Sequence, residues 1–246
     1  MVATFLPPFV SAHQLVGSVR ERGYAVLSPQ SVSDLVGFAI PELDAFKPDW
    51  RELALDRYLK DGGRYRFRRH SCFVVDDEDV IQAPHRAHWQ SLDYNALHGG
   101  MQRWFEPMLE RTAGAPSWGH LLQALAMCCS ALKGAQPWFI EAHQFRIDTC
   151  EGIGRPTPEG AHRDGVDFVA VFLVEREGIK GGETRVFEAA GPDGQRFTLE
   201  TPWSLLFLDD ERVIHESTPI QPSGETAGHR DTLVLTFRAA GFQEDA

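Results

Sequence analysis

The feature that most constrains the fold is a series of short runs, rich in β-branched and aromatic residues, that begins at residue 139. Each run has the length of a β-strand, and clusters of glycine, proline and small polar residues separate it from the next. Short strands at this spacing are typical of an all-β sandwich or barrel. The expected strands are Phe139–Ile147, Phe168–Glu175, Glu183–Phe187, Phe197–Leu199, Ser204–Leu208, Val213–Ser217 and Thr232–Phe237.

The first half of the chain has a different texture and is expected to be mainly helical, with some strand. Apolar residues recur there at helical spacing, and Gly23–Leu27 looks like one short strand. Residues 64–68 alternate arginine with aromatic residues, a pattern typical of a half-exposed strand. The expected helical segments are His13–Arg22, Ser33–Phe38, Met101–Thr112 and Gly119–Lys133.

Helices followed by strands indicate an α+β fold. We expect a single domain over residues 1–246. Its mainly helical part, residues 1–138, would pack outside a β-sandwich core formed by residues 139–242.

Composition narrows the class of partner. The formal net charge is −11, whereas a protein that binds a nucleic acid usually presents a basic surface. No run of about 18 apolar residues is present, and the first residues do not resemble a secretory signal. The four cysteines match neither a zinc knuckle nor a redox pair. We therefore expect a cytoplasmic protein that acts on a small molecule, without nucleic-acid or membrane partners. The sequence does not indicate its oligomeric state.

His162 and Asp164 are two residues apart, so on an extended chain their side chains point to the same face. His215 lies in a distant strand-like run and can supply a third ligand. Two imidazoles and one carboxylate leave three positions open on an octahedral ion, which suits Fe(II) and oxygen chemistry. His229 and Asp231 have the same spacing, but no histidine follows them. We therefore predict that His162, Asp164 and His215 bind the metal and form the catalytic centre.

Arg230, at the start of the last expected strand, is a candidate for binding an anionic ligand. The guanidinium group presents a rigid fork that matches the geometry of a carboxylate. Thr232 shares the face of Arg230 if the strand is regular, and can add a hydroxyl donor. The alternative is a surface ion pair between Arg230 and Asp231 or Glu216.

With these metal-binding and anion-binding candidates at these positions, the chain resembles the Fe(II)- and 2-oxoglutarate-dependent dioxygenases. Residues 139–242 resemble their double-stranded β-helix, or jelly-roll, core, and His162, Asp164, His215 and Arg230 match the family motif. Within this superfamily the chain looks like the small bacterial group that includes free L-isoleucine and L-leucine hydroxylases. The segments that carry this resemblance are Arg64–Phe73, Tyr94–Asn95 with Gly99–Gly100, His143–Arg146, Pro158–His162, Gly165–Phe168, Gly181–Thr184 and Arg230–Leu233.

The resemblance implies that Fe(II), 2-oxoglutarate and O₂ take part, with ascorbate as the usual reductant in vitro. Arg230 and Thr232 would bind the distal carboxylate of 2-oxoglutarate. The enzyme would hydroxylate an unactivated C–H bond of a small substrate, in the closest analogy a free aliphatic L-amino acid, and would release succinate and CO₂.

Three residues are candidates for substrate binding. Gln144 and Arg146 alternate with Phe145 on the strand before the iron motif and are expected to face the pocket. Arg66, together with its neighbouring arginines, is a candidate for binding a substrate carboxylate. The alternative for this arginine cluster is a strand face exposed to solvent.

Two other functions stay open at this point. The first is a cupin-type metalloenzyme, in which Arg230 would have no role and turnover would not depend on 2-oxoglutarate. The second is a non-catalytic metal- or ligand-binding stress-response protein with the same fold, which would not release succinate.

Overall fold

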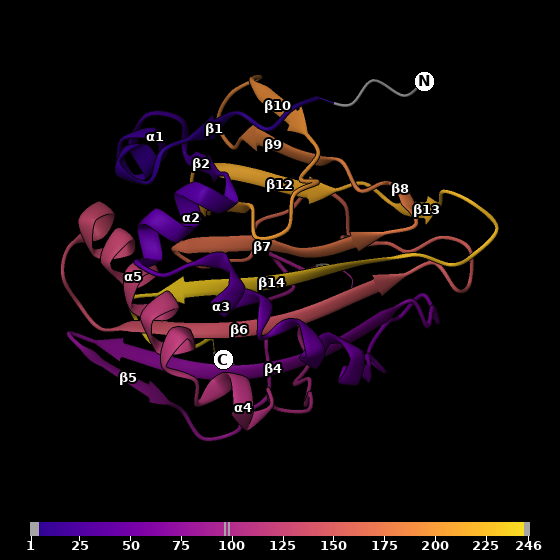
Figure 1. The fold of residues 1–246 in the computed structure, drawn as a ribbon, viewed down its shortest axis with the longest axis horizontal. Helices are drawn as coiled ribbons and strands as arrows, with labels where there is room; N and C mark the ends of the chain where they lie inside the picture. Colours follow the sequence, from indigo (N-terminus) through magenta and orange to yellow (C-terminus); the bar gives the residue numbers. More distant parts are fainter. Residues whose placement is uncertain (1–4, 96, 98, 244–246) are drawn as a thin grey trace.

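The computed structural model describes residues 5–95, 97 and 99–243. Its centre is a nine-stranded sheet in the order β1-β2-β11-β7-β14-β6-β4-β3, with β5 paired to β4 (Figure 1). These strands are β1 (Phe9–Val10), β2 (Tyr24–Leu27), β3 (Ala54–Leu55), β4 (Arg66–Asp76), β5 (Asp79–Gln82), β6 (Trp138–Asp148), β7 (Phe168–Glu177), β11 (Leu205–Asp209) and β14 (His229–Arg238).

Smaller sheets complete the β-structure. One has the order β10-β9-β12, and the other pairs β13 with β8. Their strands are β8 (Ile179–Gly181), β9 (Thr184–Glu188), β10 (Gly194–Phe197), β12 (Val213–Ser217) and β13 (Ile220–Pro222). The two larger sheets share an apolar cluster in which Val186 and Phe197 contact residues of β7 and β11. This two-layer arrangement confirms the expected jelly-roll core in an α+β fold.

The helices lie across the opposite face of the nine-stranded sheet (Figure 1). They are α1 (Leu15–Arg22), α2 (Pro29–Val36), α3 (Ile40–Asp44), α4 (Glu110–Ala113) and α5 (Pro116–Lys133), with the 3₁₀ helices η1 (Ala12–Gln14) and η2 (Lys47–Glu52). Within the part of the chain that the structure describes, none of these helices combines the length and hydropathy needed to span a bilayer.

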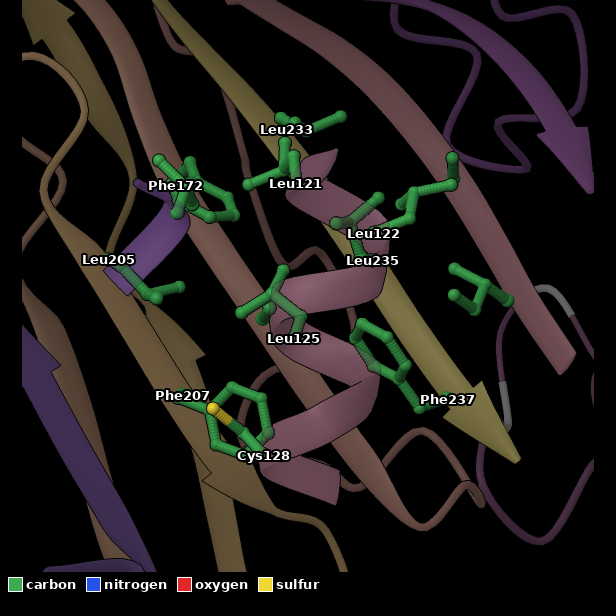
Figure 2. Packing of buried hydrophobic residues seen from close by; sticks show 14 of the residues in the cluster. Leu121, Leu122, Leu125, Cys128, Phe172, Leu205, Phe207, Leu233, Leu235 and Phe237 are labelled. Carbon is green, nitrogen blue, oxygen red and sulfur yellow. The ribbon is translucent and has the colours of Figure 1, made fainter. Parts of the chain in front are cut away.

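The main core lies between α5 and the sheet. Leu121, Leu122 and Leu125 of α5 point toward the sheet, where Leu235 and Phe237 of β14 meet them (Figure 2). All five side chains are fully buried. Burial of each contributes about 1.5–3 kcal/mol. Because side chains alternate along a strand, the same packing turns the other side chains of β14 toward the opposite face of the sheet.

Helices cover more of the described part of residues 1–138 than strands do, but the strands extend further than expected, because β4 has eleven residues and pairs with β6 in the central sheet. One expected helix is wrong. The segment 101–109 forms no helix, and only α4 lies in the range predicted as helical. Pro107 explains this, because proline cannot donate a backbone hydrogen bond inside a helix and disfavours helical backbone at Glu106.

Two expected helices are close to the observed ones. Helix α1 ends where expected, at Gly23, which adopts the left-handed conformation with φ of 78°. Helix α2 begins earlier than expected, at Pro29, because Ser28 caps its N-terminus and accepts a hydrogen bond from the Ser31 backbone.

Candidate iron and 2-oxoglutarate site

The three predicted metal ligands converge in the structure. His162 and Asp164 lie in the segment before β7, and His215 lies on β12. His162 and His215 pair through two backbone hydrogen bonds of 3.0 Å, which bring the histidines side by side. Asp164 lies 3.6 Å from Nε2 of His162 and 3.7 Å from Nε2 of His215. Donors about 2.1 Å from one octahedral ion are about 3 Å apart, so this set can close on a metal with small adjustments.

Hydrogen bonds fix the orientation of these ligands. The Nδ1–H of His162 donates to the carbonyl of Gly160 at 2.9 Å, which leaves Nε2 free to bind a metal. Gln90 donates from Nε2 to Oδ1 of Asp164 at 3.3 Å. The carboxylate of Asp210 accepts the backbone N–H groups of Asp164 and the two following residues, so it holds the turn that carries this ligand.

The electrostatics of the triad favour a bound cation. Burial would lower the pKa of His162, but contact with Asp164 and the charge of Glu159 raise that pKa to about 10. Burial would raise the pKa of Asp164, but His162 and His215 hold it well below its usual range. Burial and the charge of His162 lower the pKa of His215 to about 4. An anionic Asp164 between two imidazoles thus attracts positive charge, whether a proton or a metal ion.

The triad opens into a cavity between the two larger sheets. Its floor is formed by alternate side chains of β14, β6 and β4, and residues of β12 and the loop residues His88, Gln90, Asn95 and Arg103 complete its lining. The floor includes Thr232 and Val234 of β14 and His143, Phe145 and Ile147 of β6. The face of the sheet opposite the helical core is therefore the ligand-binding face.

Arg230 and Thr232 both line this cavity, as a carboxylate anchor would. The Arg230 side chain is buried and forms no salt bridge with any carboxylate of the described residues. The alternative, a surface ion pair with Asp231 or Glu216, is therefore wrong, and these two carboxylates pair with Arg146 and Arg185. Burial and the nearby charge of Arg176 lower the pKa of Arg230 to about 10. It is therefore a buried, charged group that an anionic ligand can neutralise.

Two of the three predicted substrate residues point away from the cavity. Gln144 is fully buried on the other side of β6 from the cavity floor, and both polar atoms of its amide lack hydrogen-bond partners within the described structure. Arg146 donates two hydrogen bonds to Asp231, at 2.8 and 2.6 Å. The prediction placed the alternation of β6 out of phase by one residue, and Phe145 lines the cavity instead.

Arg66 does line the cavity, and so does Arg68. They are 6% and 3% exposed, so this part of the arginine cluster is not a solvated strand face. Asp56 accepts a hydrogen bond of 2.7 Å from Nε of Arg66 and lies 3.9 Å from Arg68. Arg69 points elsewhere and donates to backbone carbonyls.

Sequence reasoning missed the residues that a loop contributes. His88, Gln90, Asn95 and Arg103 all line the cavity. They come from a segment without regular apolar spacing, apart from one isolated β-bridge between His88 and Arg103. Asn95 lies in a segment that carries the family resemblance, but no pattern in the sequence identifies His88, Gln90 or Arg103 as site residues.

A second group of potential metal ligands lies beside the cavity, namely His70, His88, Glu141 and His143. Hydrogen bonds already use their ligand atoms. His70 and His88 donate to the carboxylate of Glu141 at 2.8 and 2.6 Å, and Arg68 lies 2.7 Å from Nδ1 of His143. Arginine can only donate, so His143 carries its proton on Nε2, and the guanidinium charge disfavours a nearby dication. We interpret the group as a buried polar network.

The third such group is Glu175, His229 and Asp231. It contains His229 and Asp231, the pair that the sequence analysis rejected because no histidine follows them. Its third member, Glu175, comes from β7, which precedes them in the chain. Arg146 binds both oxygens of Asp231, and a guanidinium in contact with this carboxylate disfavours a dication at the same group.

Comparisons with known proteins agree with this geometry. The profile of the family described as 2OG-Fe dioxygenase matches residues 47–236. L-isoleucine-4-hydroxylase from Bacillus thuringiensis is 25% identical over 196 residues, which cover 77% of this chain and 80% of that protein.

Solved structures share the fold. A bsmA homologue from Methylobium petroleophilum PM1 is 51% identical over the full length of both chains, with a TM-score of 0.93. IDO from Bacillus thuringiensis has a TM-score of 0.74 at 20% identity, covering 95% of this chain and all of that one. The chain therefore belongs to the 2OG-Fe dioxygenase family, and it is an oxygenase that uses Fe(II), 2-oxoglutarate and O₂.

Proposed function

We infer that this oxygenase hydroxylates the side chain of a free aliphatic L-amino acid. The observation that carries this proposal is the cavity itself, in which three convergent metal ligands lie with buried cations and with the apolar side chains of Phe145, Ile147 and Val234. The similarity to L-isoleucine-4-hydroxylase supports the same substrate class.

His162, Asp164 and His215 would hold the iron, since they combine one carboxylate with two imidazoles, each neutral once it binds the metal. When bound, the iron supplies the oxidative chemistry, in which 2-oxoglutarate and O₂ are consumed. The residues of the chain orient the ligands, bind the co-substrate and substrate, and limit the access of water. Arg230 and Thr232 would bind the distal carboxylate of 2-oxoglutarate.

Charge and size support a small substrate. The cavity is lined by side chains of both larger sheets and by His88, Gln90, Asn95 and Arg103, and a pocket lined on several sides in this way suits a small molecule. The net charge of −11 makes a nucleic-acid substrate unfavourable. Val171, Val234 and Phe145 give the cavity apolar surface against which an aliphatic side chain can pack.

The test is a panel of free L-amino acids incubated with the protein, Fe(II), ascorbate and 2-oxoglutarate. Mass spectrometry should detect one added oxygen atom in at least one aliphatic amino acid, with an equal amount of succinate. His162→Ala should abolish both products, whereas the matched change at exposed His120 should not. If no amino acid gains oxygen or raises succinate release above the background without substrate, the proposed substrate class is wrong.

A further inference from the structure

Two oppositely charged side chains line the cavity without pairing with each other. Arg103 is 2% exposed; it donates to Oε1 of Gln90 at 2.9 Å, and its Nε–H has no partner in the described structure. The side chain of Glu159 is 13% exposed, and its buried Oε2 atom also has no hydrogen-bond partner among these residues. Arg103 and Glu159 form no salt bridge with each other within 4.0 Å in the described chain. The negative charge of Glu159 nevertheless acts on Arg103 over a longer distance and raises its pKa.

The cationic side of this pair contains a second guanidinium. Burial and the charge of Arg66 lower the pKa of Arg103 to about 10, so Arg103 stays charged at neutral pH. Asp56 binds Nε of Arg66, but a terminal N–H group of Arg66 has no partner within the described residues. Two neighbouring guanidinium groups with free donors repel each other, and a carboxylate with two oxygens would both relieve this repulsion and accept both donors.

Both charged groups are connected to the metal ligands. Gln90 accepts from Arg103 and donates to Asp164, so one hydrogen-bonded residue separates the guanidinium from a ligand. Glu159 lies 3.5 Å from Nε2 of His162. A molecule bound between the two charges would therefore lie next to the iron.

Building on the proposed function, we propose that Arg103 and Arg66 bind the α-carboxylate of the substrate and that Glu159 binds its α-ammonium group. An α-amino acid carries these two charges on one carbon atom, so it fills the gap between a cation and an anion that do not pair. The cavity then selects the zwitterion over a molecule with only one of the two charges. Strand β6 lies between β4, which carries Arg66, and β14, which carries Arg230, so 2-oxoglutarate would bind at a separate cation.

The test measures binding of three probes to protein loaded with Ni(II) and 2-oxoglutarate, which does not turn over. L-isoleucine carries both charges, 3-methylpentanoate only the carboxylate, and 2-methylbutylamine only the ammonium group. In isothermal calorimetry the wild-type protein should bind L-isoleucine more tightly than either single-charge probe, by about 10- to 150-fold.

The variants Arg103→Met and Glu159→Gln should have crossed effects. Arg103→Met should remove the advantage of L-isoleucine over the amine and keep its advantage over the acid. Glu159→Gln should do the reverse. Arg103→Lys should restore part of the lost affinity. Unchanged affinities for Ni(II) and 2-oxoglutarate serve as the control for correct folding in every variant.

Several results would overturn this assignment. If the wild-type protein binds no aliphatic amino acid, the proposed substrate class fails and this inference fails with it. If L-isoleucine binds but the variants shift all three probes equally, only the assignment of Arg103 and Glu159 is wrong. A larger effect of Arg103→Met on 2-oxoglutarate than on L-isoleucine would make Arg103 a co-substrate residue. A change in Ni(II) affinity alone in Glu159→Gln would make Glu159 a metal ligand.

Discussion

Replacing Arg230 with glutamine should separate ligand binding from stability. The Arg230 side chain is 4% exposed, and its pKa of about 10, lowered mainly by burial, leaves it charged at neutral pH. No described carboxylate forms a salt bridge with it. A buried cation without an anionic partner costs stability in the ligand-free protein, and an anionic ligand removes that cost. The substitution Arg230→Gln should therefore lower the affinity for 2-oxoglutarate without lowering the stability of the ligand-free protein.

The expected sizes follow from these contacts. Loss of a charge-assisted hydrogen bond costs about 1.5–3 kcal/mol, so the Kd for 2-oxoglutarate should rise about 10- to 150-fold. The free energy of unfolding of the ligand-free Arg230→Gln variant should stay the same or rise by about 0.5–2 kcal/mol. Metal affinity should change little, because Arg230 has no contact with His162, Asp164 or His215.

Calorimetric titration of the Ni(II)-loaded protein measures the first quantity, and urea unfolding of the metal-free protein measures the second. Arg238→Gln is the matched control, because Arg238 lies on the same strand, is partly exposed and does not line the cavity. A Kd for 2-oxoglutarate within twofold of wild type would refute the role of Arg230. A loss of stability together with the loss of affinity would show that Arg230 supports the fold instead.

Two further predictions concern groups beside the triad. Gln90→Leu removes the hydrogen bond that orients Asp164 and should weaken Ni(II) binding about 10- to 100-fold in a chelator competition. The control variant Gln144→Leu should leave Ni(II) binding unchanged. Equal Ni(II) affinities in these two variants would contradict the role of Gln90. Burial lowers the pKa of His88 from 6.5 to about 3. Between pH 3 and pH 6.5 the unfolded chain therefore binds more protons than the folded chain. The free energy of unfolding should fall as the pH is lowered through this range, by up to about 1.4 kcal/mol per pH unit. Urea unfolding of the metal-free protein should show a shallower pH dependence in His88→Gln and no change in His120→Gln, and identical slopes in both variants would exclude His88 as a source.

Two of the three metal ligands could be predicted because their geometry is local. An extended backbone places His162 and Asp164 on one face whatever the rest of the chain does. The strand-like run around His215 also forms β12 with the expected bounds, Val213–Ser217. The absence of a histidine after Asp231 favoured this pair over His229 and Asp231, and in the structure the guanidinium of Arg146 binds Asp231 of that other pair.

The sequence could not predict which side chains of β6 point toward the cavity, because both faces of this strand are buried. Residues on each side of this strand, such as Gln144 and His143, are almost fully inaccessible. A strand covered on both faces lacks the polar and apolar alternation that reveals which residues point toward a cavity. The helix predicted over Met101–Thr112 is absent from residues 101–109, because Pro107 interrupts helical backbone there and Met108 packs into the core from a segment that is not helical.

The loop residues show the largest gap between sequence and site. Gln90 and Arg103 have roles only because the chain between β5 and α4 folds back over the sheet, where His88 and Arg103 pair through two backbone hydrogen bonds of 2.9 and 3.0 Å. Such a closure depends on tertiary contacts and leaves no periodic pattern. Nothing in the local sequence distinguishes these residues from ordinary surface polar groups.

The balance of charge around the cavity joins these assignments into one argument. Four guanidinium groups and two carboxylates line the cavity, namely Arg66, Arg68, Arg103, Arg230, Glu159 and Asp164, and the carboxylates of Asp56 and Glu141 lie directly behind, bound to Arg66 and His88. A low-dielectric site tolerates charge best when the total is close to zero. Fe(II) and the 2-oxoglutarate dianion cancel each other, and a zwitterionic amino acid adds no net charge. A substrate with a single charge would upset this balance, so under the proposed function the overall charge adds to the individual contacts in selecting an amino acid.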